Sequence, residues 1–377
     1  MGGIYFHIPF CRRKCLYCNF FSTADVRRMP QMCDAMRREL IDRAASWPHR
    51  DVRTVYFGGG TPSLLPAEDI AMFLAEVRRS FRLADDAEVT VEANPEDLSP
   101  EKAARWRHAG VNRVSLGVQS FDDAALAFMG RRHSGADAVR AVETLRSAGF
   151  ENLTIDLIYG IPGRSDDVLR RDVGTALGLG VRHVSAYALT VEPGTALDVL
   201  IGRKRLPAPD DEDAARQYGI VTALLEKAGM ERYEVSNFAF PSYRSRHNSS
   251  YWSGVPYLGI GPSAHSFDGR AERRWNAASA GGYIAGAEKG AVPFESERLS
   301  EKDLHNEAVM TALRTCEGLS LADFARRFGP ESRDRLLRGA QQYIDRGQAE
   351  IVGGTLRITP AGVFFTDGIS AHLFAVD

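Results

Sequence analysis

Along the first 200 residues, short apolar runs alternate with longer stretches in which apolar positions recur at helical spacing. The short runs are rich in β-branched and aromatic residues and predict strands at 3–8, 53–57, 87–92, 112–117, 153–158 and 183–188. The longer stretches predict amphipathic helices near 30–46, 66–80, 100–109, 134–148 and 165–180. Strands that alternate with helices form parallel βαβ units, so this pattern predicts an α/β fold built as a partial, TIM-like (β/α)6 barrel.

After residue 200 the pattern changes twice. Gly, Ser, Pro and aromatic residues first dominate, which predicts structured loops with short strands. From Ser300 helical spacing returns, and Ser300 and Asp303 have the spacing of a capping box at the start of a helix. Further helices are expected near 320–327 and 330–347, and Gly353-Gly354 predicts a hairpin turn. Helices followed by a hairpin predict a winged-helix-like module. The predicted organisation is a barrel at 1–200, an aromatic and loop-rich connecting region at 201–299 and a C-terminal module at 300–377.

The composition is typical of a soluble globular protein, since 44% of the 377 residues are hydrophobic, 25% are charged and the formal net charge is −2. Charges of both signs are interspersed, and acidic residues outnumber basic ones after residue 300, so no nucleic-acid partner is expected. No apolar run reaches the roughly 18 residues of a transmembrane helix. The N-terminus lacks the basic region of a signal peptide, so we expect a cytoplasmic protein.

Three of the five cysteines, Cys11, Cys15 and Cys18, lie close together with the spacing C-x3-C-x2-C. Thiolates this dense in a cytoplasmic protein are typically metal ligands. A zinc site would need a fourth ligand, commonly from a second pair of cysteines, and no such pair follows. Three thiolates instead suit a [4Fe–4S] cluster that leaves one iron open for a ligand. The alternative is that the three cysteines pack as small apolar side chains.

Glycines and polar residues gather where the predicted strands end, and a (β/α) barrel carries its chemistry at those ends. Gly59, Gly60 and Thr61 follow the second strand in YFGGGTP, and successive glycines let a backbone approach a ligand closely. Glu92 closes the third strand, and Asp156 lies within the fifth. A buried carboxylate is costly unless it is paired or bound to a ligand. Each residue also has a structural interpretation, such as a tight turn at the glycines.

These motifs resemble the radical S-adenosylmethionine (radical SAM) superfamily. The segments YFHIPFC, GGGTP, VEANP, GVQSF and DLIYGIPG are similar to one branch of it, which contains the oxygen-independent coproporphyrinogen III dehydrogenases and the HemW group of haem chaperones. The resemblance covers nearly the whole chain and implies that Cys11, Cys15 and Cys18 hold a [4Fe–4S] cluster. It also implies contacts to S-adenosylmethionine (SAM) at Tyr5, Gly59, Gly60, Thr61, Glu92, Gln119, Arg131 and Asp156.

Two features separate the two groups of this branch. Phe20 stands where the dehydrogenases have a further cysteine, and the first strand begins without the N-terminal extension that they carry. The segment RHNSSYW has an H-N-x-x-Y-W pattern that resembles the haem-binding motif of the chaperones, with the residues His247, Asn248, Tyr251 and Trp252. Histidine is a common axial ligand of haem iron, aromatic rings offer flat faces to a porphyrin, and His265 is a second candidate ligand. The structural interpretation is that these side chains pack a loop region.

The resemblance therefore implies a haem chaperone that binds haem and delivers it to acceptor haem proteins, with respiratory proteins at the membrane surface as the expected acceptors. It implies a [4Fe–4S] cluster, SAM and haem as cofactors, and it leaves room for an electron donor to the cluster. No catalytic residue is assigned, because SAM and the cluster could serve dimerisation or transfer instead of radical turnover. The alternatives are an oxygen-independent coproporphyrinogen III dehydrogenase and a radical SAM enzyme with another substrate.

Overall fold

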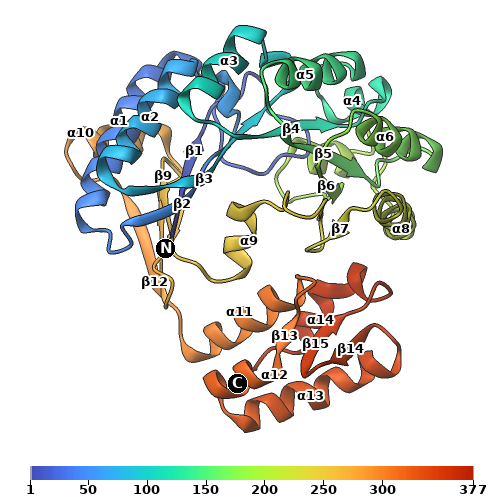
Figure 1. Ribbon diagram of the computed structural model, residues 1–377. Helices are drawn as coiled ribbons and strands as arrows, with labels where there is room; N and C mark the ends of the chain where they lie inside the picture. Colours follow the sequence, from blue (N-terminus) through green and yellow to red (C-terminus); the bar gives the residue numbers. More distant parts are fainter. Residues whose placement is uncertain (1, 377) are drawn as a thin grey trace.

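Six parallel strands form the centre of the molecule in the computed structural model, which describes residues 2–376 (Figure 1). Strands that are consecutive in the sequence pair side by side, and helices lie along the outer side of the curved sheet. The strands are β1 Gly2–Ile8, β2 Asp51–Gly59, β3 Arg82–Ala93, β4 Arg113–Gln119, β5 Asn152–Tyr159 and β6 His183–Ala188. All six predicted strands are present, so the predicted partial (β/α)6 barrel is confirmed.

Helices connect the barrel strands and cover their outer face (Figure 1). They are α1 Met29–Ser46, α2 Ala67–Ser80, α3 Pro100–Ala109, α4 Asp123–Met129, α5 Gly135–Ser147 and α6 Asp166–Gly178, with short 3-10 helices at Val26–Arg28, Pro62–Leu64 and Pro95–Asp97. Ser99 caps α3 by accepting a hydrogen bond from the backbone N–H of Lys102, and Gly149 ends α5 with a φ of +86°. Phe6, Phe57 and Phe73 are among the side chains that fill the core between sheet and helices.

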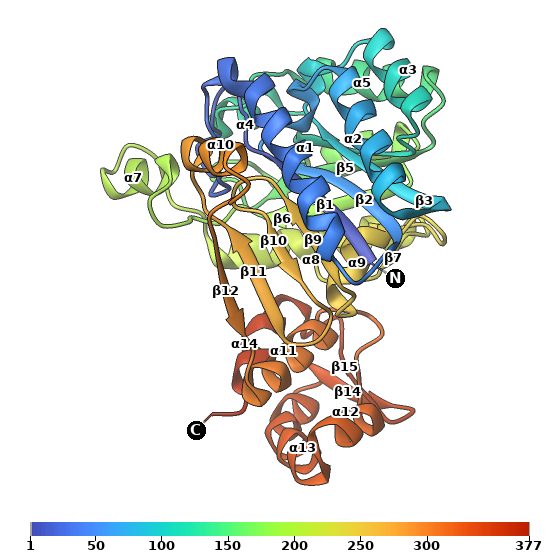
Figure 2. The ribbon, with the colours of Figure 1, turned by 90° about the vertical axis from the view of Figure 1, so that its left-hand side faces the viewer.

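Residues 201–299 contain more regular structure than the predicted loops. The sheet continues at both ends, with β8 and β7 beyond β6 and with β9 to β12 beyond β1. The elements from residue 196 on are α7 Ala196–Gly202, α8 Asp211–Lys227, β7 Glu231–Arg232, β8 Asn237–Ala239, α9 Arg246–Trp252, β9 Tyr257–Ile260, β10 His265–Phe267, β11 Glu272–Asn276, α10 Ala280–Glu288 and β12 Phe294–Arg298. The sequence pattern concealed α8 because its buried side includes the small Ala214 and the polar Gln217. Helix α7 projects from the body of the barrel (Figure 2).

The C-terminal module lies below the barrel and has a core of its own, built around Val309, Phe324 and Leu356 (Figures 1 and 2). Its elements are α11 Glu301–Leu313, β13 Leu319–Ser320, α12 Leu321–Phe328, α13 Pro330–Asp345, β14 Ala349–Val352, β15 Thr355–Ile358, a 3-10 helix at Val363–Phe365 and α14 Thr366–His372. The predicted capping box at Ser300 and the predicted hairpin are present, which gives a winged-helix-like module. The three-part division of the chain stays a prediction, and its outermost positions, 1 and 377, lie outside the described residues.

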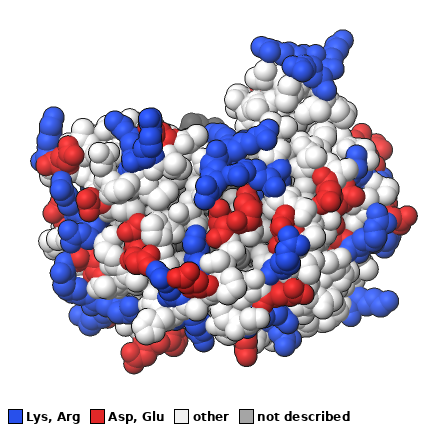
Figure 3. All heavy atoms as spheres, turned by 90° about the horizontal axis from the view of Figure 1, so that it is seen from above, with Lys and Arg blue, Asp and Glu red and all other residues white. Residues whose placement is uncertain are grey.

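Charged side chains of both signs are spread over the molecular surface. In Figure 3 the upper face shows acidic and basic side chains side by side, with one dense group of Lys and Arg near its centre. Across residues 2–376, each helix is either too short or too polar to cross a membrane.

A buried carboxylate ties the first helix to the extension of the sheet. Glu39 on α1 is 2% exposed and accepts hydrogen bonds from the backbone N–H of Gly261 at 2.9 Å and from the side-chain amide of Asn276 at 2.7 Å. The hydroxyl of Tyr283 on α10 and the guanidinium of Arg43 also donate to it. Donors from separate segments thus converge on one buried charge, so these segments cannot part without leaving that charge unpaired.

Glu39→Ala is expected to lower the free energy of unfolding by about 3–5 kcal/mol, because it removes the carboxylate and leaves buried donors unsatisfied. Urea unfolding followed by circular dichroism measures the loss. The exposed Glu143 on α5 provides the control, since Glu143→Ala should change the unfolding free energy by less than about 0.5 kcal/mol. Equal effects of the two substitutions would contradict the proposed role of Glu39.

Candidate functional site

One cavity of about 1140 Å³ lies between the barrel strands and the C-terminal module. Each of the strands β1 to β6 contributes to its wall, with Tyr5, Gly59, Glu92, Gln119, Asp156 and Tyr187 as examples. The opposite wall includes Arg314, Val363 and Phe364 of the C-terminal module. All three predicted cluster cysteines and all eight predicted SAM residues border this cavity. The parallel sheet therefore brings together predicted site residues that are up to 151 positions apart in the sequence, from Tyr5 to Asp156.

The three cysteines lie on the loop between β1 and α1, and backbone hydrogen bonds fix the loop at its base and its middle. The N–H of Cys11 donates to the carbonyl of Thr23 at 3.1 Å, and the N–H of Thr23 donates to Pro9 at 2.7 Å. In the middle, Leu16 donates to Met129 and accepts from Leu197. The side chain of Leu16 also packs against a small apolar cluster under α4 and α7. The loop is thus held from both sides without using any of the thiols.

The sulfur atoms receive hydrogen bonds from the cavity wall. The hydroxyl of Thr61 lies 3.4 Å from Sγ of Cys11, and a guanidinium nitrogen of Arg131 lies 3.4 Å from Sγ of Cys15. Donors aimed at sulfur stabilise the thiolate form that binds iron. Burial raises the pKa of Cys18, so that thiol depends on a bound metal to lose its proton.

The arrangement of the thiols suits a cluster of several irons. Within residues 2–376, no three His, Cys, Asp or Glu side chains converge on a point where they could hold a single metal ion. A [4Fe–4S] cluster binds each thiolate through a different iron, so its ligands are spread apart. Three half-buried thiols that border one cavity from a single short loop meet that requirement.

The glycine segment after β2 lies against the base of the cysteine loop. Gly59 has a φ of +103°, and a Cβ atom there would lie 2.6 Å from the ring of His7. A Cβ atom on Gly60 would lie 2.7 Å from the carbonyl oxygen of Phe10, one residue before Cys11. Only glycine therefore fits at these two positions, which lets the segment pack closely against β1 and the start of the cysteine loop.

Two buried acidic side chains, Glu92 and Asp156, face the cavity. Glu92 accepts hydrogen bonds from the hydroxyl of Tyr56 at 2.8 Å and from the N–H of Gly59 at 3.2 Å. Burial raises the pKa of Glu92 to about 7, and the nearby charge of Asp156 adds to the rise. Burial also raises the pKa of Asp156 to about 6, against the effect of hydrogen bonds from neighbouring serines such as Ser115. Both carboxyl groups are suited to accept hydrogen bonds from a polar ligand.

Arg131 and Gln119 complete the wall beside the cysteine loop. Besides its contact with Cys15, Arg131 donates to the side-chain oxygen of Asn94 at 2.7 Å and to the carbonyl of Gly117. Gln119 has a φ of +69°, a conformation that non-glycine residues seldom adopt, and the pairing of β4 with β5 shifts register just before it. Such strained positions are common at binding sites because the surrounding structure has to enforce them.

The predicted haem motif behaves differently, because only Tyr251 of its four residues borders the cavity. His247 is 1% exposed, and both of its ring nitrogens are engaged, Nδ1 with the hydroxyl of Thr54 at 2.8 Å and Nε2 with that of Tyr251 at 2.9 Å. Its ring stacks on Tyr56 at 4.9 Å between centroids. Burial lowers the pKa of His247 to about 3, so the imidazole is neutral. In this conformation His247 is a buried link between the barrel and α9.

The other two motif residues also lie away from the cavity. Asn248 is in the first turn of α9, which Ser245 caps. The ring of Trp252 lies under the guanidinium of Arg314, and its indole N–H has no partner within the described residues. His265, the second candidate ligand, does border the cavity, and its exposed ring stacks on Trp275.

Sequence reasoning missed several residues of the site, namely Tyr56, which hydrogen-bonds to Glu92, and wall residues such as Asn94. Tyr56 and Asn94 lie in the quoted motifs YFGGGTP and VEANP, so their positions next to Gly59 and Glu92 in those motifs could have identified them. Arg314, Val363 and Phe364 carry no such signal, because they reach the cavity only through the packing of the C-terminal module on the barrel.

Comparisons with known proteins agree with this geometry. Residues 5–174 match the radical SAM superfamily, and residues 299–365 match the HemN C-terminal domain. A Mycobacterium tuberculosis protein named "Heme chaperone HemW" is 42% identical over 374 residues, which cover 97% of this chain and 93% of that protein. A Bacillus subtilis protein of the same name is 37% identical over 333 residues and 87% of each chain.

The solved structure of the radical SAM enzyme coproporphyrinogen III oxidase (HemN) from Escherichia coli superposes with a TM-score of 0.85. The superposition covers 99% of this chain and 90% of that chain. At 21% sequence identity, the similarity shows that the two chains share a fold.

The raised pKa of Glu92 predicts that the ligand-free protein loses stability as the pH rises from about 4.3 to about 7. Below this range the carboxyl group is protonated in both the folded and the unfolded states, so its ionisation does not change the free energy of unfolding. Within the range the unfolded chain releases its proton while the folded chain keeps it, which favours unfolding. Glu92→Gln should therefore gain about 1–3 kcal/mol relative to the wild type between pH 4 and pH 8.

Urea unfolding at a series of pH values measures this difference, and the exposed Glu350 on β14 provides a control in Glu350→Gln. If Glu92→Gln and the wild type have parallel pH profiles, the carboxyl of Glu92 does not have a raised pKa.

Proposed function

Because this chain belongs to the HemW family of the radical SAM superfamily, we propose that it is a haem chaperone, which binds haem and delivers it to acceptor haem proteins. The observation that carries the proposal is the make-up of the large cavity, which combines a cysteine loop, buried carboxyls and an aromatic wall. Its volume of about 1140 Å³ exceeds what one small ligand usually needs. A cavity of this size and composition has room for a cofactor and a flat apolar ligand together.

On the barrel side, Cys11, Cys15 and Cys18 would hold a [4Fe–4S] cluster. When bound, the cluster supplies an iron that no thiolate of this chain occupies, where SAM can bind. Glu92 and Asp156 would accept hydrogen bonds from hydroxyl or amino groups of SAM, and the lack of side chains at Gly59 and Gly60 leaves space for its amino-acid end. Tyr5, Thr61, Gln119 and Arg131 would complete the SAM site, because all of them border the same part of the wall.

On the opposite side, haem would lie against the aromatic side chains between the barrel and the C-terminal module. Tyr251, Tyr257 and Phe364 border the cavity there, and Arg314 offers a cation for a propionate group. We propose two candidate axial ligands. His265 already borders the cavity, whereas His247 would have to give up its hydrogen bond to Tyr251 before its Nε2 could reach an iron.

The proposed acceptors are respiratory haem proteins, reached from the cytoplasm. All five cysteines of the chain are free thiols, which suits a reducing compartment. Acidic and basic side chains are mixed over the upper face, so the surface there offers no broad cationic track for a nucleic acid (Figure 3). We therefore expect proteins as partners.

Replacing Cys11, Cys15 or Cys18 by Ala is expected to abolish the visible absorbance and most of the bound iron after anaerobic cluster reconstitution, because no other thiol of the chain borders the cavity. Iron analysis and absorbance spectra measure both effects. Cys33→Ala and Cys316→Ala are the controls, since these cysteines lie elsewhere, and an equal loss in either control would overturn the assignment.

The chaperone function is tested by transfer. Protein with a reconstituted cluster is loaded with haem under anaerobic conditions and mixed with apomyoglobin, and the Soret band should move to the spectrum of holomyoglobin. In parallel, coproporphyrinogen III is supplied with SAM and a reductant, and no product is expected, since Phe20 stands where the dehydrogenases have a further cysteine. If product forms in at least stoichiometric amount and no haem is transferred, the proposed function changes from haem chaperone to coproporphyrinogen III dehydrogenase.

The axial ligand is tested with His247→Ala and His265→Ala. If His265 ligates the iron, His265→Ala should shift the Soret band and weaken haem binding by about tenfold or more, whereas His247→Ala should keep the ligand field of the wild type. The reverse result would show that α9 moves to release His247 from Thr54 and Tyr251. If neither substitution matters, the proposed haem wall is wrong.

A further inference from the structure

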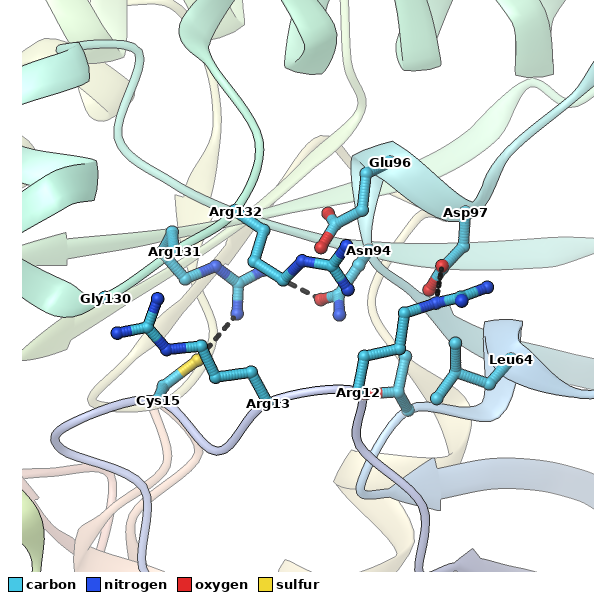
Figure 4. A pocket seen from close by; sticks show the side chains of 11 residues that line it. Arg12, Arg13, Cys15, Leu64, Asn94, Glu96, Asp97, Gly130, Arg131 and Arg132 are labelled. Carbon is cyan, nitrogen blue, oxygen red and sulfur yellow. Dashed lines mark hydrogen bonds and ion pairs between the residues drawn. The ribbon is translucent and has the colours of Figure 1, made fainter. Parts of the chain in front are cut away.

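Four arginines surround a small cavity on the outer side of the cysteine loop. Arg12 and Arg13 belong to the loop itself, whereas Arg131 and Arg132 follow α4. The cavity has a volume of about 20 Å³ and is also lined by Cys15. Figure 4 shows the side chains of Arg13 and Arg131 on either side of the Cys15 sulfur, with Arg132 above them. Positive charge from two separate segments thus meets at one cysteine of the candidate cluster site.

The acidic residues of the same pocket leave most of this positive charge unbalanced at the surface. The side chain of Asp97 is only 3% exposed and accepts a hydrogen bond from Ser63, and Arg12 lies 3.5 Å from it with 59% of its own side chain exposed. Glu96 lies 3.4 Å from the ring of His133 in the interior. Arg13, Lys14 and Arg132 are exposed and have no ion-pair partner within residues 2–376. We define Arg12, Arg13, Lys14 and Arg132 as the loop patch.

The loop patch lies next to the large cavity, because Arg13 and Lys14 border that cavity while Arg12 and Arg132 do not. Cys15 borders both the small outer cavity and the large inner one. A guanidinium nitrogen of Arg131 lies 3.4 Å from its sulfur and connects the two sides. A redox partner bound to the loop patch would therefore lie close to Cys15, with only the side chain of Arg131 between the two sides of the loop. This short path favours electron transfer through this face.

We propose that the loop patch is the docking surface of an acidic one-electron carrier protein that reduces the cluster. The inference rests on the proposed cluster at Cys11, Cys15 and Cys18. With a flavin carrier, the hydroquinone anion of the flavin gives up one electron and becomes the neutral semiquinone, and the oxidised cluster takes up that electron. Complementary charge steers such a carrier to the patch and speeds association at low salt. Four basic side chains suit a local contact with an acidic protein better than the extended row of phosphate contacts that a nucleic acid makes.

The experiment compares the wild type with the double variant Arg12→Gln/Arg132→Gln. Neither residue borders the large cavity, so the SAM and cluster sites are left intact. The probe is an acidic bacterial flavodoxin. Calorimetry with cluster-free protein should show binding that is about tenfold weaker in the variant and that weakens with salt in the wild type. Stopped-flow absorbance should show slower reduction of the reconstituted cluster by flavodoxin hydroquinone, with unchanged reduction by dithionite.

The matched control is Arg335→Gln/Arg338→Gln, which removes the same charge from exposed positions on α13. It should bind and react as the wild type does. If flavodoxin binds all three proteins equally, or if an RNA oligonucleotide binds the wild type and flavodoxin does not, the proposal is overturned. If the double variant Arg12→Gln/Arg132→Gln loses its native circular dichroism spectrum, the single variant Arg132→Gln is measured in the same assays, and its result decides the proposal. Failure to form a cluster would overturn the proposed cluster site, while the calorimetry still decides the docking surface.

Discussion

The parallel pairing of β1 to β6 is the constraint on which the site depends. Its register sets Tyr5 opposite Tyr56, Glu92 opposite Ser115 and Asp156 opposite Ser185, so each side chain of the wall has a fixed neighbour on the next strand. Hydrogen bonds then run between strands at the same level, as from Ser115 to Asp156. A slip of one residue would turn every one of these groups to the other face of the sheet. The site is therefore a property of the sheet as a whole.

Most of the barrel could be predicted from the sequence because its strands are near-continuous apolar runs, and its helices have clear caps such as Ser99 and Gly149. The position of the cysteines and of Glu92 followed from the same pattern, since strand ends converge in any (β/α) barrel. The positions of the short strands β9 to β12 were not predictable, because β9 pairs with β1, and β10 to β12 extend the sheet beyond it, only once the barrel exists. The role of His247 was also hidden, since a buried hydrogen-bonded histidine and a metal ligand look identical in a sequence.

Tyr56 connects two parts of the molecule that the sequence presented as separate motifs. Its hydroxyl donates to Glu92, and its ring stacks on His247. His247 in turn holds Tyr251, and Trp252 at the end of the same helix contacts Arg314 of the C-terminal module. These contacts form a continuous path from Glu92 in the barrel to Arg314 of the C-terminal module. The H-N-x-x-Y-W motif therefore has a structural function in this conformation, whatever it binds.

The large cavity, or chamber, lies between the barrel and the C-terminal module, and we call the boundary between these two parts the seam. Its two walls belong to the barrel and to the C-terminal module, whose cores touch through Val363 and Ile358, and the backbone links across the seam include the hydrogen bonds from Val235 to Arg314 and from Cys316 to Tyr233. A small tilt at that seam would change the height of the chamber and would repack only the few side chains that the two cores share, such as Val363. On the far wall, Val363 is part of the barrel core, whereas the exposed Asp367 can vary without cost to that core. The wall formed by the C-terminal module can therefore change to suit a bound ligand of another size or chemistry, while the barrel wall proposed for the cluster and SAM stays the same.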